Sequence, residues 1–259
     1  MDISELKRID ETNIRSRHPW ELARSRIIYT LIKKRAAPVG TIIDFGSGDM
    51  FLLHNLEQKK IATNYFAIDN AYTKPLIENL KHNYPESVIV PITGINDIDS
   101  QSLPADVFLF LDVIEHCEND RLILSNAANK RFADTDSTIL ITAPAFQSLF
   151  SYHDKLLNHY RRYNLKELSE ACRSSGLHVT QKGYFFFSLL PLRIFQLFLE
   201  KIKISKPEKS IDNWKGGKTL TSLLSSLLWL DFKISYLIGK TGIKLPGLSC
   251  YCICHPSQS

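Results

Sequence analysis

The sequence predicts an α/β fold with a mostly parallel sheet and helices on both of its faces. Short β-branched or apolar runs alternate with helix-like segments through the first two thirds of the chain. Their spacing allows right-handed β-α-β crossovers, which place strands side by side in a parallel sheet. Of the 259 residues, 44% are hydrophobic and 23% are charged, as is usual for a globular domain with a full core.

Seven strands are expected, five of them before residue 150. They are 41–45, 64–69, 87–93, 105–113, 137–144, 177–187 and 248–254. Helices are expected at 10–35, 50–60, 73–83 and 118–132. A further helix should begin after Asn164, because Asn164 and Glu167 have capping-box spacing, and Gly176 should end it.

This pattern divides the chain into four segments. They are an N-terminal helical lid (1–40), a ligand-binding core (41–188), a basic amphipathic helical insertion (189–245) and the final strand of the core (246–259). The insertion holds ten Lys and Arg against four Asp and Glu, a net charge of +6, while the whole chain carries +5. The positive charge therefore belongs to one late segment.

A glycine turn, DFGSG (44–48), lies where the first strand leads into the first helix. Glycines there let the backbone approach a ligand closely. Asp69 ends the second strand, where a carboxylate can accept both hydroxyls of a ribose. A dinucleotide site is the alternative, but Phe51 replaces the third glycine and Asp44 would repel phosphates. The pattern favours a ribose-bearing ligand with a cationic group.

Three motifs resemble class I S-adenosylmethionine-dependent methyltransferases in their order and spacing. They are IIDFGSG (42–48), FAID (66–69) and FLFLDVIEH (108–116), and the likeness extends over about 41–176. LDVIEH (111–116) resembles the branch of ubiquinone-biosynthesis O-methyltransferases, of methyltransferase type 11/12. The resemblance implies a seven-stranded Rossmann-like sheet whose last strand lies antiparallel beside the fifth.

The resemblance also implies S-adenosylmethionine as the cofactor and assigns residues to it. These are Asp44, Gly46, Ser47, Gly48, Asp69, Asn70, Asn96, Asp97, Ile98, Leu111 and Asp112. The glycine turn takes the methionine end, Asp69 and Asn70 take the ribose and adenine, and 96–98 matches the adenine segment.

A divalent metal is a second expectation from the same branch. There, the residues at Asp112, Glu115 and His116 can hold a cation, and carboxylates with one imidazole suit magnesium or manganese. The alternative is that the two acids shape the pocket and cap the next helix, while His116 packs over the cofactor and contacts the substrate. The sequence favours the alternative.

A polar stretch, FSYHDKLLNHYRRYN (150–164), follows the fifth strand and lies over the expected ligand crevice. Methyl transfer to oxygen needs a base that works near neutral pH, which histidine provides. The first candidate is His153, with Asp154 beside it in sequence, and His159 is the second; one of the two histidines is as readily a loop-ordering hydrogen-bond partner. On the acceptor side we expect Arg161, Arg162 and Tyr163, since arginines bind carboxylates and phosphates.

The N-terminal RHPWELARSR (17–26) is expected to form a helix that covers the cofactor. The insertion between the last two strands fits an interfacial element on anionic lipid, a wall of an apolar substrate pocket or a homodimer surface. The chain start has no apolar signal-peptide region, and five cysteines without zinc-site spacing indicate a reducing, cytoplasmic setting.

The sequence predicts a methyltransferase that acts on oxygen of a small-molecule, glycan or lipid-linked acceptor. Nucleic acid is not expected as a partner, because two adjacent arginines make a small electrostatic footprint and no motif of base-amino methyltransferases occurs. The alternative is a catalytically silent module that binds S-adenosylmethionine and recruits a partner or a membrane through its basic insertion.

Overall fold

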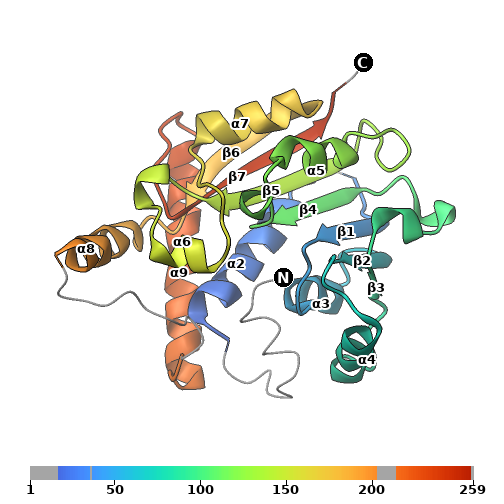
Figure 1. Ribbon diagram of the computed structural model, residues 1–259, viewed down its shortest axis with the longest axis horizontal. Helices are drawn as coiled ribbons and strands as arrows, with labels where there is room; N and C mark the ends of the chain where they lie inside the picture. The colour runs from blue at the N-terminus through green and yellow to red at the C-terminus, as the bar shows by residue number, and fades with distance from the viewer. Residues whose placement is uncertain (1–16, 36, 203–213, 258–259) are drawn as a thin grey trace.

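The structure, a computed structural model, describes residues 17–35, 37–202 and 214–257 (Figure 1). Its centre is a seven-stranded sheet with the order β3-β2-β1-β4-β5-β7-β6. The strands are β1 Thr41–Phe45, β2 Asn64–Ile68, β3 Val90–Ile92, β4 Val107–Leu111, β5 Thr138–Pro144, β6 Leu177–Phe185 and β7 Ser249–Pro256. Neighbours among β1 to β5 pair in parallel, and β7 lies antiparallel between β5 and β6. The predicted sheet is confirmed.

Helices cover both faces of the sheet, as Figure 1 shows. They are α2 Pro19–Ile32, α3 Phe51–Gln58, α4 Lys74–Asn83, α5 Asp120–Ala127, α6 Tyr152–Leu156, α7 Leu165–Ser174, α8 Leu190–Lys201 and α9 Lys218–Gly239. Side chains from α2, α3, α4 and α9 form the core on one face, and those from α5 and α7 form the core on the other. Strands β1, β2, β4, β5, β6 and β7 contribute to both cores because their side chains alternate between the faces.

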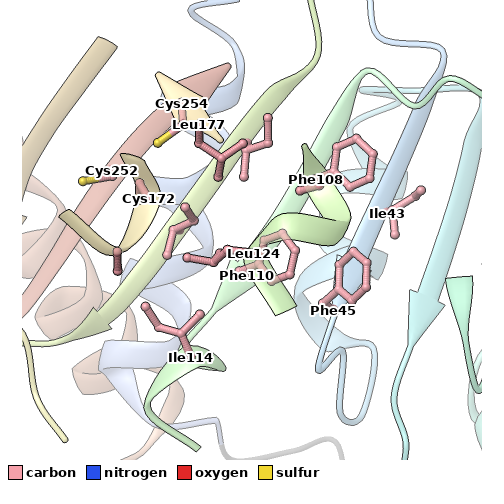
Figure 2. Close-up of a cluster of buried hydrophobic side chains, with 14 of the residues drawn as sticks. Ile43, Phe45, Phe108, Phe110, Ile114, Leu124, Cys172, Leu177, Cys252 and Cys254 are labelled. Carbon is pink, nitrogen blue, oxygen red and sulfur yellow. The ribbon is translucent and has the colours of Figure 1, made fainter. Parts of the chain in front are cut away.

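The second core contains the alternating cysteines of the last strand. Cys250, Cys252 and Cys254 are fully buried free thiols, and Cys252 and Cys254 lie near Cys172 and Leu177 in Figure 2. Their shared face confirms that the alternation indicates buried side chains.

Several elements are shorter than the sequence suggests. The strand expected at 87–93 covers only Val90–Ile92. The helix expected at 118–132 is Asp120–Ala127, and the Asn119 side chain caps its start by accepting a hydrogen bond from the Leu122 N–H. Part of the polar stretch forms α6, which begins at a capping box of Ser151 and Asp154.

The segment between β6 and β7 is helical where the structure describes it. Helix α9 packs along α2 and β6, while α8 projects from the body and has no buried residue (Figure 1). Within the described ranges, no helix has both the length and the hydropathy to cross a bilayer. Most of KIKISKPEK (201–209), and the part of the first predicted helix before residue 17, lie outside the described residues.

Candidate active site

A cavity of about 540 Å³ opens at the carboxyl ends of the parallel strands. Parallel sheets bind ligands at this edge. Among the residues that line it are Gly46 after β1, Asp69 after β2 and Asp112 after β4. The polar stretch adds residues from the other side, so one cavity joins the two motif groups that the sequence singles out.

The glycine turn has a backbone that other residues fit poorly. Gly46 has a φ of 68°, and a Cβ built there would lie 2.7 Å from the Val113 side chain. Its N–H donates to the Ile68 carbonyl (2.8 Å), which ties the turn to the end of β2. Gly48 also has a positive φ, 56°, and donates its N–H to the Asp69 carboxylate (3.2 Å). The turn and Asp69 are therefore one unit.

Asp69 is almost fully buried and lines the cavity beside Asn70. Its carboxylate accepts hydrogen bonds from the N–H groups of Gly48 (3.2 Å) and Ala71 (2.9 Å). A carboxylate at the end of this strand can accept hydrogen bonds from the hydroxyls of a ribose.

Asp44 lies behind the turn, next to a smaller cavity of about 70 Å³ that Gly46 and Ser47 also line. Burial raises the pKa of Asp44 to about 7, although a hydrogen bond from the Ser47 hydroxyl (2.9 Å) and the nearby Arg24 favour the charged form. A cationic ligand group would stabilise the ionised carboxylate, as the sequence-based reasoning expects.

Helix α2 contributes two residues to both cavities, Trp20 and Arg24. Arg24 forms an ion pair with Asp112 (3.0 Å), whose backbone is held in the left-handed region at a φ of 56°. Asp112 also accepts a hydrogen bond from the Thr142 hydroxyl (2.9 Å). The helix thus lies against the cavity, and Arg24 is a site residue that the sequence analysis missed.

The segment expected to contact adenine is not part of the cavity lining. Asn96, Asp97 and Ile98 are not among the residues that line either cavity described above. Asn96 accepts a hydrogen bond from Arg131 (3.3 Å), and Ile98 is buried in the second core. Asp97 lies in the short 3₁₀ helix Ile95–Asp97 and accepts a hydrogen bond from the Thr93 hydroxyl (3.3 Å), and it is Thr93 that lines the cavity.

The polar stretch brings an aspartate and a histidine together, but not the pair that is adjacent in sequence. Asp154 is fully buried, and its Oδ1 accepts hydrogen bonds from His159 Nδ1 (3.0 Å) and Arg162 Nε (2.7 Å). Its Oδ2 accepts from the Ser151 N–H (2.8 Å). Burial raises the pKa of Asp154, but the bonds from His159 and Arg162 outweigh it and hold the pKa below its usual range.

This arrangement makes Asp154 the partner of His159. Because His159 uses Nδ1 for Asp154, its Nε2 is the ring nitrogen that remains for the cavity, which His159 lines. An aspartate that fixes a histidine tautomer in this way is the usual support of a general base.

His153 lines the same cavity from the first turn of α6. Among the described residues, no side chain or backbone group hydrogen-bonds its ring. Burial, and after it the nearby Arg193, lower the pKa of His153 from 6.5, so the ring is neutral at neutral pH. It is available as a base, but nothing orients it as Asp154 orients His159.

Two residues expected on the acceptor side do not reach the cavity. Arg161 donates to the Glu118 carbonyl (2.7 Å) and pairs with Asp120 (3.4 Å), so it joins the loop to α5. Tyr163 is buried, and its hydroxyl donates to the Asp120 carboxylate (2.7 Å). Of the three predicted acceptor residues in this loop, Arg162 lines the cavity.

Glu115, His116 and His159 form a second cluster at the cavity. One ligand atom from each lies within 4.8 Å of the others, a grouping that suits a divalent cation. Glu115 is fully buried, neither of its carboxylate oxygens has a hydrogen-bond partner among the described residues, and burial raises its pKa well above 4.5. Asp112, the third predicted ligand, is engaged by Arg24 instead.

Arg193 is a further residue that the sequence analysis counted only as a charge. It comes from α8, lines the cavity and donates to the Ser151 hydroxyl (2.6 Å). Leu189 and Phe186 line the cavity beside it. The start of the insertion is therefore a wall of the site, which was one of its three expected roles.

No protein-family model and no curated protein sequence matches the chain. Solved structures do. An S-adenosylmethionine-dependent methyltransferase from Archaeoglobus fulgidus aligns with a TM-score of 0.50 at 16% identity, over 95% of this chain and 97% of that one. Phosphoethanolamine N-methyltransferase 2 from Haemonchus contortus, in complex with S-adenosyl-L-methionine, has a TM-score of 0.53 at 13% identity, over 90% of this chain and 53% of that one.

The chain has the methyltransferase fold. The fold alone does not fix the reaction, because the [4+2]-cyclase SpnF is equally similar. It aligns with a TM-score of 0.53 at 10% identity, over 91% of this chain and 81% of that one. Function must therefore be argued from the site.

Proposed function

We propose that this protein transfers a methyl group from S-adenosylmethionine to an oxygen of its acceptor. The observation that carries the proposal is one continuous cavity, lined by Asp69 and Gly46 at one side and by His159 at the other. Such a cavity can hold a ribose-bearing methyl donor and an acceptor against each other. Orientation of two bound reactants accounts for much of the rate in a transfer of this kind.

The donor would bind as the sequence motifs imply. Asp69 would accept the ribose hydroxyls, and Asp44 would favour the cationic end of the ligand across the glycine turn. Arg24 lines both cavities and offers a guanidinium to the methionine carboxylate.

His159 is the base that this geometry supports best. The acceptor hydroxyl would give its proton to Nε2 of His159, while Asp154 holds Nδ1 and stabilises the imidazolium. The acceptor oxygen then forms its bond to the methyl carbon, and the electrons of the broken carbon–sulfur bond stay on the sulfur of S-adenosylhomocysteine. Arg162 and Arg193 line the acceptor side and suit a carboxylate or phosphate.

The residues also fit a divalent cation, because the buried Glu115 carboxylate has no hydrogen-bond partner in the described part of the chain and two imidazoles lie close to it. Glu115, His116 and His159 would hold it. A bound cation would lower the pKa of an acceptor hydroxyl. His159 Nε2 cannot serve as a metal ligand and as a base at once. Calorimetric titration of Mg²⁺ and Mn²⁺ into the wild type and into Glu115→Gln distinguishes the metal-ligand role from the role of base.

Helix α8 supports an acceptor that is reached at a lipid surface. Arg193, which lines the cavity, donates to the Gln196 side chain (2.9 Å) and pairs with Glu200 (3.9 Å). Its exposed side chains include four large apolar ones, Leu192, Ile194, Phe195 and Phe198, and Lys201 at its end. An exposed apolar helix face next to a basic segment binds anionic bilayers.

The test is turnover of S-adenosylmethionine with fractionated acceptor extracts, followed as formation of S-adenosylhomocysteine. We expect His159→Gln and Asp154→Asn to lower turnover with nearly unchanged cofactor affinity. Arg161→Ala is the matched control, since Arg161 belongs to the same loop but faces away from the cavity. Cofactor binding without product from any fraction would instead support the silent binding module.

A further inference from the structure

Helix α9 has a second apolar face that no described residue covers. Its members are each between 47% and 58% exposed: Leu220, Leu223, Leu227, Leu230, Ile234 and Leu237. A continuous row of large apolar side chains on a protein surface usually marks an interaction site.

The rotation of α9 is fixed by its other face. Leu228 and Phe232 are buried in the first core against the sheet. The Ser226 hydroxyl accepts a hydrogen bond from Arg26 of α2 (3.0 Å), and Asp231 accepts bonds from the Phe187 and Ser188 N–H groups (2.9 and 3.0 Å). The exposed row therefore cannot turn inward without breaking these contacts.

The spacing of the row identifies the kind of partner. The six residues follow one another at steps of three, four, three, four and three, the a and d positions of a heptad repeat. Such a row is narrow, whereas the apolar face of a helix on a bilayer or a globular core is about 100° wide or more. Polar residues such as Ser226 and Lys233 border it on one side, and Leu224, Asp231 and Ile238 border it on the other. The row has the pattern of a helix–helix seam.

We propose that a second copy of this chain covers the row, with the two α9 helices packed antiparallel about a two-fold axis. With the axis near Leu228, Leu220 of one copy lies opposite Leu237 of the other, and Leu227 lies opposite Leu230. Every apolar side chain of the row then meets another. Antiparallel packing is favoured because the helix dipoles oppose each other, and because Lys233 lies beside Ser226 of the second copy rather than beside Ile238.

The expected dimer is weak. The transfer free energy of leucine, divided by the usual free energy per unit area, gives the apolar area of its side chain. On that basis the twelve half-exposed side chains of the two rows bury on the order of 600 Å² of apolar surface. Stable interfaces bury about 1,200 Å² or more, so the seam and its polar borders together give an interface at the lower end of the range. Dimerisation should accordingly depend on protein concentration.

Analytical ultracentrifugation from about 1 to 100 μM covers the range expected for such an interface. We expect the wild type to shift from monomer to dimer, and Leu227→Glu to stay monomeric with an unchanged circular dichroism spectrum. Leu192→Glu is the matched control, since Leu192 is an exposed leucine on α8 outside the row, and it should still dimerise. A wild type that is monomeric throughout, or a Leu227→Glu variant that dimerises, would overturn the proposal.

Cross-linking tests the arrangement itself. A mixture of Leu220→Cys and Leu237→Cys chains should form an intermolecular disulfide under mild oxidation. Leu220→Cys alone should not, because the two equivalent residues are about 25 Å apart along antiparallel helices. Disulfide formation by Leu220→Cys alone would refute the antiparallel pairing. Loss of vesicle binding by a monomeric Leu227→Glu chain would show that the row contacts lipid instead. Neither measurement depends on methyl transfer.

Discussion

The pH dependence of cofactor binding is expected to follow the ionisation of Asp44. Burial raises its pKa to about 7, and a cationic ligand binds the charged carboxylate better than the neutral one. About one tenth of Asp44 is ionised at pH 6 and nine tenths at pH 8, so affinity for S-adenosylmethionine should rise roughly tenfold, about 1.4 kcal/mol, over this range.

Isothermal titration calorimetry across this pH range measures the effect, and Asp44→Asn isolates it. The variant should bind more weakly at high pH and lose most of the slope. Adenosine is the matched ligand control, since it keeps the ribose and adenine but lacks the sulfonium and the amino group of the methionine part. The affinity for adenosine should not change with the ionisation of Asp44. A wild-type affinity that is flat with pH, or an unchanged slope in Asp44→Asn, would refute the reasoning.

The same carboxyl also affects folding stability. Its folded-state pKa of about 7 lies above the ordinary value of 3.8, so its contribution to stability is complete below about pH 4 and is lost as the pH rises to 7. Thermal unfolding should therefore show the wild type losing stability relative to Asp44→Asn across this window.

Three further outcomes are expected. Asp69→Ala should weaken S-adenosylmethionine binding by about 10- to 100-fold, because hydrogen bonds to one charged group are lost. Asp97→Ala should leave the affinity measured by calorimetry unchanged, and equal effects of the two substitutions would support the assignment of Asp97 to the adenine. His159→Gln should lower turnover by about 10²- to 10⁴-fold and Arg161→Ala by little, so full activity of the histidine variant would remove it as the base. The wild type should float with anionic vesicles at low salt and Phe195→Ser should not; failure of the wild type to float would exclude α8 as a lipid contact.

The strands and the edge that carries the site could be predicted from sequence because both depend on local patterns. Buried parallel strands appear as β-branched runs such as TIIDF (41–45), and their carboxyl ends meet at one edge of the sheet. Asp69 and Gly46 therefore reach the cavity as expected. The Asn164 capping box was also predictable, since it needs only two residues three positions apart.

Contacts within the polar stretch could not be predicted in the same way. The sequence pairs Asp154 with its neighbour His153, but α6 turns the carboxylate toward His159 and Arg162. Arg24 and Arg193 come from segments far from the motifs, and only tertiary packing brings them to the cavity. A capped five-residue helix and two distant arginines leave no periodic signal in the sequence.

The central claim is that this cavity holds S-adenosylmethionine. Calorimetric titration of the wild-type chain with S-adenosylmethionine and, separately, with NAD tests it most directly. We expect saturable binding of about one S-adenosylmethionine per chain, as one site with Asp69 directly after β2 requires, and no response to NAD. Saturable binding of NAD with no heat from S-adenosylmethionine would contradict it.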